Sequence, residues 1–275
     1  MFPILFQLGS FTFSSLGVLV GLGFFIGFFI AWRRLAELGF DEEKIVDAFL
    51  FSSLIAFLFS RLFYVLSHFA QFSFSFIKWF FFWRFSGLSL AGAIIGFLIG
   101  SLYFAKKEKW DIFRVADELV FSLFPFLILA FLGQFFDGSN LGAETGIFWG
   151  VFFPSDMIRR HPVSFLGAIL LFVTWIFFLK IERQWRVWKW YKSKKEGLLF
   201  FAFLAAFSFV TFLLAFLKPT GLYFVLVERL VGGLLVVVFL SLVYIRSGRK
   251  LREDFLLIKA GFLTLRLKYK KGKKL

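Results

Sequence analysis

The chain has 275 residues, of which 60% are hydrophobic and 23% aromatic, and its formal net charge is +15. A water-soluble domain of this length needs a polar exterior, so the composition excludes an ordinary soluble enzyme. There is no cysteine, which excludes disulfides, thiolate nucleophiles and cysteine-ligated metal. Two histidines are too few for a histidine-rich metal site. We expect neither a metal nor a cofactor.

Seven apolar runs are each close to the ~20 residues that a helix needs to cross a bilayer. The sequence therefore predicts an all-α integral membrane protein with seven transmembrane helices. Residues 1–245 form the predicted membrane domain, and residues 246–275 form a basic cytoplasmic tail. No basic region precedes the first run, so no cleaved signal peptide is expected. In chain order the runs are 14–32, 46–67, 86–105, 115–135, 163–179, 197–217 and 222–245.

The basic residues indicate the orientation of these helices. Most of the 32 lysines and arginines lie in the connections after the odd-numbered runs and in the C-terminal tail. Because cytoplasmic loops carry the excess of lysine and arginine, the N-terminus is expected outside and the C-terminus in the cytoplasm. Aromatic and basic residues alternate at 185–191, as is typical of the membrane interface. Basic residues gathered beside the predicted membrane helices suit anionic lipid, which argues against nucleic acid as a partner.

Two segments stand out on the predicted external side. Residues 69–84 alternate phenylalanine with serine before an aromatic cluster, which suits a short strand or a shallow helix in the outer interface. Residues 136–162 form the longest external connection and the most polar one. No internal repeat is evident, which disfavours a transporter.

Polar residues at membrane depth are costly, so they mark the places to look for chemistry. Arg61 falls in the outer half of the second predicted helix. It either binds a phosphate or is a structural arginine that pairs with a carboxylate such as Asp137. The stretch 133–142 combines glycines with amide, carboxylate and hydroxyl side chains, and it is either a plain loop or backbone that approaches a ligand. Arg160-His161-Pro162 either caps the fifth helix or places a cation and an imidazole beside an anionic headgroup.

Four elements occur in order along essentially the whole chain: Arg61-Leu62-Phe63-Tyr64, Gly87 to Gly96, Ala130 to Gly142, and Arg160-His161-Pro162. Through these elements the chain resembles the prolipoprotein diacylglyceryl transferases of bacteria. The resemblance implies seven membrane helices in the same orientation, within the cytoplasmic membrane of a prokaryote.

The resemblance also implies a reaction. The diacylglyceryl group of phosphatidylglycerol passes to the lipobox cysteine thiol of a lipoprotein precursor, with release of glycerol phosphate. Membrane phospholipid and lipoprotein precursors are then the expected partners. Cations must hold the phosphodiester, and a base must take the thiol proton. The candidates for catalysis are Asp137 and His161, and those for substrate binding are Arg61, Tyr64, Gly87, Ser89, Gln134, Gly138, Asn140 and Arg160.

The chain departs from the family pattern at the positions that carry its catalytic charges. Ala91 replaces a histidine, Phe131 an arginine and Ser139 a glutamate. In the sixth helix an arginine and a glutamate fall on Val210 and Leu214. Losing an arginine that stabilises a developing phosphate charge typically lowers the rate by orders of magnitude.

Three hypotheses follow from these departures. The first is a divergent transferase that uses Arg61 or Arg160 for phosphate and Asp137 or His161 as base. The second is a catalytically inactive homologue that binds phospholipid or lipoprotein precursors. The third is a carrier or channel. We also predict an anionic headgroup site between the second helix and the segment 133–162.

Overall fold

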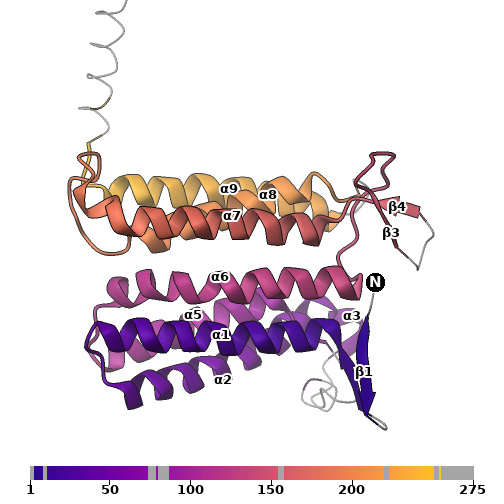
Figure 1. Ribbon diagram of the computed structural model, residues 1–275, viewed down its shortest axis with the longest axis horizontal. Coiled ribbons are helices and arrows are strands. Elements are labelled where there is room, and N and C mark those ends of the chain that lie inside the picture. Colours follow the sequence, from indigo (N-terminus) through magenta and orange to yellow (C-terminus); the bar gives the residue numbers. More distant parts are fainter. Residues whose placement is uncertain are drawn as a thin grey trace, which may run out of the picture. The chain divides into compact units, whose positions relative to one another are not determined.

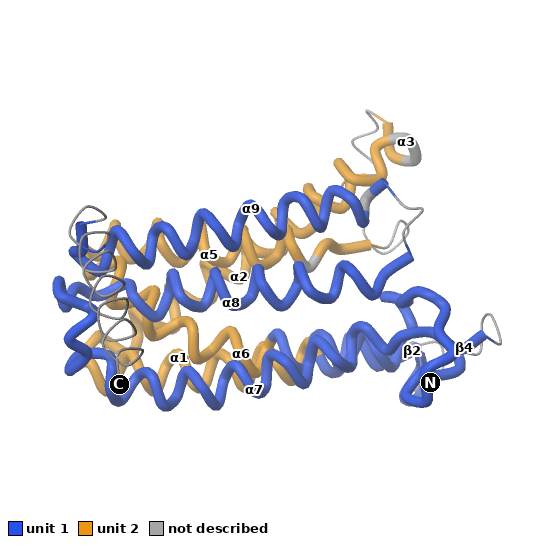
Figure 2. Tube along the Cα trace, turned by 90° about the horizontal axis from the view of Figure 1, so that it is seen from above, with its two compact units in different colours: residues 1–19, 127–275 blue, residues 20–126 orange. Residues whose placement is uncertain are grey.

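The computed structural model describes residues 3–8, 11–73, 79, 87–153, 158–219, 223–250 and 254. It divides into two compact units, which Figure 2 distinguishes by colour. Unit 2 comprises residues 20–126, and unit 1 comprises residues 1–19 together with 127–275. Both boundaries fall inside continuous helices, α1 Ser15–Glu37 and α6 Ile112–Asp137.

Unit 2 is a bundle of helices that run alongside one another (Figure 1). It holds most of α1, the first part of α6, and three helices between them. These are α2 Glu42–Ser67, the short α3 Phe69–Phe72 and α5 Leu90–Lys107.

Unit 1 contains the end of α6, three further long helices and two β-hairpins. The helices are α7 Val163–Gln184, which continues as a 3₁₀ turn over Trp185–Val187, α8 Leu198–Ala215 and α9 Tyr223–Arg246. The hairpins pair β1 Ile4–Leu8 with β2 Phe11–Ser14, and β3 Val151–Phe153 with β4 Ile158–Arg160.

Each predicted membrane run coincides with a helix, and the part of the chain described contains six helices long and apolar enough to span a bilayer. They are α1, α2, α6, α7, α8 and α9. The protein is therefore a helical, multi-pass membrane protein. The third run corresponds to α5, whose crossing stays a prediction, as does the orientation of the termini. The predicted helical fold is confirmed, and the two short hairpins are additions that the sequence did not predict.

The two remaining segment predictions are met only in part. Of the short strand or shallow helix expected within 69–84, a short helix is present as α3, and its depth in the membrane stays a prediction. Residues 74–78 and 80–86 lie outside the described residues. Most of the predicted basic tail also lies outside them. Its described start is held by Asp254, whose carboxylate accepts hydrogen bonds from Arg249 Nε (2.6 Å) and from Tyr244 Oη (2.7 Å). These bonds lower the pKa of Asp254 to about 2.

Glycines at intervals of four bring α5 against α2. A Cβ added to Gly92 would lie 2.5 Å from the carbonyl oxygen of Phe59, and one on Gly96 would lie 2.7 Å from that of Ile55. Small residues at this spacing allow membrane helices to approach to backbone contact. The glycine-rich 87–96 element therefore has a packing role in unit 2, whatever its chemistry.

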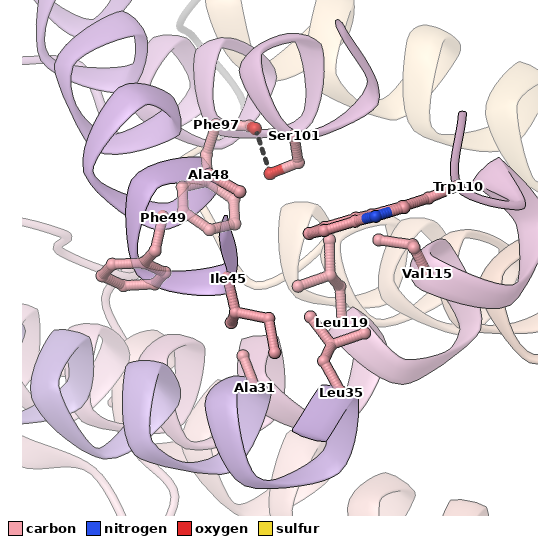
Figure 3. Close-up of a pocket in the computed structure, with 10 residues that line it drawn as sticks. All are labelled: Ala31, Leu35, Ile45, Ala48, Phe49, Phe97, Ser101, Trp110, Val115 and Leu119. Atoms are coloured by element: carbon pink, nitrogen blue, oxygen red, sulfur yellow. Dashed lines mark hydrogen bonds between the residues drawn. The ribbon is translucent and has the colours of Figure 1, made fainter. Parts of the chain in front are cut away.

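Ion pairs and a small apolar core join the helices of unit 2 at the other end of α5. Arg34 Nε lies 2.7 Å from Glu118 Oε2, and Lys44 Nζ lies 2.7 Å from Glu108 Oε2. Beside them is a cavity of ≈ 20 Å³ lined mainly by apolar side chains, among them Trp110 (Figure 3). This volume holds about one water molecule, so the cavity is a packing defect and too small for a substrate.

Candidate functional site

Arg61 sits at the junction between α2 and the start of α5 in unit 2. Only 8% of the residue is exposed. Its Nε donates to the carbonyl oxygen of Trp79 (2.8 Å) and its Nη1 to that of Gly87 (2.9 Å), and its guanidinium lies over the ring of Phe72. A buried guanidinium needs such acceptors because desolvation of a charge is costly. Arg61 therefore fixes the chain that leads into α5.

Three other predicted binding residues share this junction with Arg61. Gly87 has φ of +138°, and a Cβ there would lie 2.0 Å from Cζ of Tyr64, so only glycine fits against that ring. The side chain of Ser89 caps α5 by accepting from the backbone N–H of Gly92, at 3.3 Å. The structure thus brings Arg61, Tyr64, Gly87 and Ser89 together.

A second group of predicted residues lies where α6 ends in unit 1. Gly138 has φ of +73°, and its N–H donates to the carbonyl oxygen of Gln134, at 3.0 Å. Asn140 Nδ2 lies 3.4 Å from Gln134 Oε1. These contacts form a glycine-terminated helix end, in which the left-handed residue satisfies the last carbonyls. Asp137 is the final residue of α6 and is half-buried, and its side chain makes no hydrogen bond or ion pair to the described residues.

The connection after α6 folds back on the start of α7. The N–H of His161 donates to the carbonyl oxygen of Ala143, at 3.0 Å, and Arg160 Nη1 donates to that of Gly142, at 3.3 Å. Arg160 Nη2 lies 3.8 Å from Glu144 Oε1. A Cβ on Gly142 would come within 2.3 Å of the carbonyl oxygen of His161, so glycine is required for this close approach. The expected cation and imidazole are therefore held beside α7.

Two buried polar atoms at the start of α7 have no hydrogen-bond partner among the described residues. They are Nδ1 of His161 and Oγ of Ser164, one helical turn further along. A buried polar group left unpaired costs about 1–3 kcal/mol, so such atoms mark places where a ligand or water can bind. His161 could be identified from the sequence as a candidate, and Ser164 could not. The only available signal was the closeness of Ser164 in sequence to the Arg160-His161-Pro162 element.

Three of the five positions where the resemblance places catalytic charges are apolar core in unit 1, whereas Ala91 in unit 2 and Ser139 are exposed. Phe131 on α6 is 7% exposed, and Val210 and Leu214 on α8 are 5% and 3% exposed. A Cβ added to Gly167 on α7 would lie 2.5 Å from the Phe131 ring and 3.0 Å from Cδ1 of Leu214. Gly167 therefore lets the Phe131 and Leu214 side chains meet against α7. The space next to Gly167 is therefore filled by the hydrocarbon side chains of Phe131 and Leu214.

The described residues contain no group of three or more His, Cys, Asp or Glu side chains arranged to hold a metal ion. The chemistry available to them is that of arginine, imidazole, carboxylate, hydroxyl and backbone groups. These can bind an anionic headgroup or move a proton. The headgroup site predicted between α2 and segment 133–162 draws on both units and stays a prediction.

Six apolar helices with polar groups held at helix ends define a polytopic helical membrane protein. A sequence profile of the prolipoprotein diacylglyceryl transferases matches residues 3–250, and the chain belongs to this family.

Similar proteins come from several bacteria, and all three described here are named phosphatidylglycerol–prolipoprotein diacylglyceryl transferase. The one from Geobacter sulfurreducens is 26% identical over 221 residues, covering 78% of this chain and 82% of the relative. That from Halalkalibacterium halodurans is 25% identical over 264 residues, covering 91% and 88%. That from Aeromonas salmonicida is 29% identical over 231 residues, covering 81% of each. The similarity therefore spans most of both chains.

Proposed function

We propose that this protein is a member of the family that binds phospholipid or lipoprotein precursors and does not carry out conventional diacylglyceryl transfer. The observation that carries the proposal is the apolar packing of Phe131, Gly167 and Leu214. Transfer of a diacylglyceryl group leaves a phosphate, whose developing charge needs cations in a preorganised site. A phenyl ring and an isobutyl group supply none of that stabilisation.

The ligands are proposed from the names of the relatives and from the polar groups that this chain retains. The relatives are named for phosphatidylglycerol and prolipoprotein. Arg160 supplies a cation next in sequence to His161, whose Nδ1 has no partner among the described residues, and close packing at Gly142 holds this segment in place. We expect the binding site to face the external side of a prokaryotic cytoplasmic membrane, with the protein crossing seven times.

A divergent transferase is the second candidate function, and the unpaired imidazole atom favours it. His161 Nδ1 can accept a proton if the other ring nitrogen carries the hydrogen. In that case His161 or Asp137 would take the proton of the lipobox thiol, and Arg160 or Arg61 would hold the phosphate. A carrier or channel is not supported by any described feature of the site.

A transfer assay separates these two functions. Purified protein in vesicles that contain phosphatidylglycerol labelled in its acyl chains is given a lipobox peptide, and peptide lipidation is followed. The Aeromonas salmonicida relative serves as the positive control. We expect lipidation by that enzyme and none by this protein. Lipidation at a comparable rate would refute the proposal, and its loss in His161→Gln would then identify the relocated base.

Binding is measured separately, by native mass spectrometry of protein released from vesicles of phosphatidylglycerol and phosphatidylcholine. We expect selective retention of phosphatidylglycerol, weakened several-fold by Arg160→Gln. Arg33→Gln is the matched control, because Arg33 is an exposed arginine of α1 and lies outside the connection that holds Arg160. Equal retention of both lipids would contradict headgroup binding even if the transfer assay is negative.

A further inference from the structure

The connection between α6 and α7 exposes an unusual amount of aromatic surface. Phe148 is 86% exposed, Trp149 50% and Phe152 57%. We call these three residues the aromatic tip. The rings of Phe148 and Trp149 meet edge to face, with centroids 4.7 Å apart. Clustered large apolar side chains of this kind mark surfaces that contact a membrane or another protein.

The aromatic tip is held on a folded framework. The N–H of Gly150 donates to the carbonyl oxygen of Ile147, closing a turn, and the N–H of Thr145 donates to that of Arg159. In the hairpin, Phe152 pairs directly with Arg159. The backbone therefore fixes the direction in which the tip is presented.

The positive charge beside the aromatic tip indicates which kind of surface the tip contacts. The guanidinium of Arg159 lies 4.7 Å from the ring centre of Phe152, and Arg159 is exposed. Arg160 points to the opposite face of the strand, where it contacts Gly142 and Glu144. Aromatic rings beside an exposed cation match the boundary between acyl chains and anionic headgroups. The outward face of the hairpin thus complements a lipid surface that carries negative charge.

Chain connectivity places the tip close to the bilayer. The candidate membrane span of α7 begins at Val163, four residues after Arg159. At about 3.3 Å per extended residue, Arg159 and Val163 are at most roughly 13 Å apart along the chain. The headgroup layer is several ångströms thick on each side of the hydrocarbon core. Figure 1 shows β3 and β4 at the end of α7, within the same unit.

We propose that the aromatic tip inserts into the headgroup–acyl boundary of the bilayer at the N-terminal end of α7, with Arg159 against anionic headgroups. The inference does not depend on the proposed function. Its consequence is that Gly142, Arg160 and His161, which belong to the same folded connection, are held at the level of the lipid headgroups. A ligand drawn from the membrane would then reach them without leaving it.

The absence of cysteine allows the depth of the tip to be measured directly. Phe148→Cys is spin-labelled and reconstituted into vesicles of phosphatidylethanolamine and phosphatidylglycerol. Collisions of the label with oxygen, which concentrates in lipid, are compared with collisions with a water-soluble nickel chelate. Ser139→Cys, at an exposed position of the same connection, is the water control, and Phe172→Cys, 49% exposed on α7, is the lipid control.

We expect the oxygen-to-nickel ratio at Phe148 to exceed that at Ser139 several-fold and to approach that at Phe172. Trp149→Cys should give the same result, which covers the case in which Phe148→Cys does not fold. Adding Arg159→Gln should lower the ratio in vesicles with phosphatidylglycerol and leave it unchanged in vesicles of phosphatidylcholine.

Three outcomes would overturn the proposal. A ratio equal to that at Ser139 would place the tip in water. Low accessibility to both reagents would mean that protein covers it, such as a second copy of this chain. A label that is accessible to nickel until a lipobox signal peptide is added would make the tip a peptide-binding surface.

Discussion

Replacing Gly96 by alanine should loosen the contact between α2 and α5. The added Cβ would lie 2.7 Å from the carbonyl oxygen of Ile55 and 2.8 Å from Cα of Ala56, which is several tenths of an ångström inside ordinary contact. Backbone atoms cannot turn aside, so the helices must move apart. Overpacking of this kind costs about 1–3 kcal/mol, against which the better helix propensity of alanine offsets up to about 1 kcal/mol. With that offset in full, we expect a net destabilisation of up to roughly 2 kcal/mol.

Gly21→Ala is the matched control, because Gly21 lies on α1 in the same unit and an added Cβ meets nothing within 4 Å. That variant should be unchanged or slightly more stable than the parent. The free energies of unfolding are compared by titrating the detergent-solubilised proteins with sodium dodecyl sulfate and following circular dichroism. If Gly96→Ala is as stable as Gly21→Ala, the close packing of α5 on α2 is not what stabilises unit 2.

Three further predictions concern charge. Reporter fusions at Lys107 should register as cytoplasmic and those at Asp156 as external, and the opposite pattern would invert the topology. Arg61→Gln should lower the melting temperature, because a neutral amide donates more weakly to the carbonyls that Arg61 joins; an unchanged melting temperature with loss of phosphatidylglycerol would instead make Arg61 a ligand-binding residue. Because Arg249 and Tyr244 lower the pKa of Asp254 from 3.8 to about 2, their contact should persist as the pH falls from 8 to about 4 and be lost as it falls through 2. At pH 8, where trypsin is active, Asp254→Asn should therefore expose Arg249 to cleavage while the parent stays protected.

The long helices could be predicted from the sequence because apolar length and periodicity are local properties. The predicted run 163–179 starts with α7 at Val163, since Pro162 lacks the N–H that would continue a helix upstream. Its end was placed too early, because α7 continues to Gln184 through charged residues. Hydropathy measures the hydrocarbon crossing, and a helix can extend beyond it into the interface.

The hairpins and the partners of the site residues depend on contacts between distant segments, which one sequence does not reveal. β3 and β4 are three residues each, and their register depends on packing against 143–145. Arg61 was identified as an important cation, but its acceptors at Trp79 and Gly87 are 18 and 26 residues away. The role of Arg61 in joining two backbone segments by hydrogen bonds therefore became visible only in the structure.

The side chains that meet at Gly167 also bear on how readily this chain could change its chemistry. Phe131→Arg alone would place an unpaired guanidinium in hydrocarbon, and Leu214→Glu alone would bury an unpaired carboxylate. Each costs several kcal/mol, a large fraction of the stability of a typical protein. Only the two substitutions made together would place opposite charges where each can neutralise the other. Single mutational steps toward a charged pocket thus pass through poorly folded intermediates, so the apolar core opposes a stepwise gain of charge at this place.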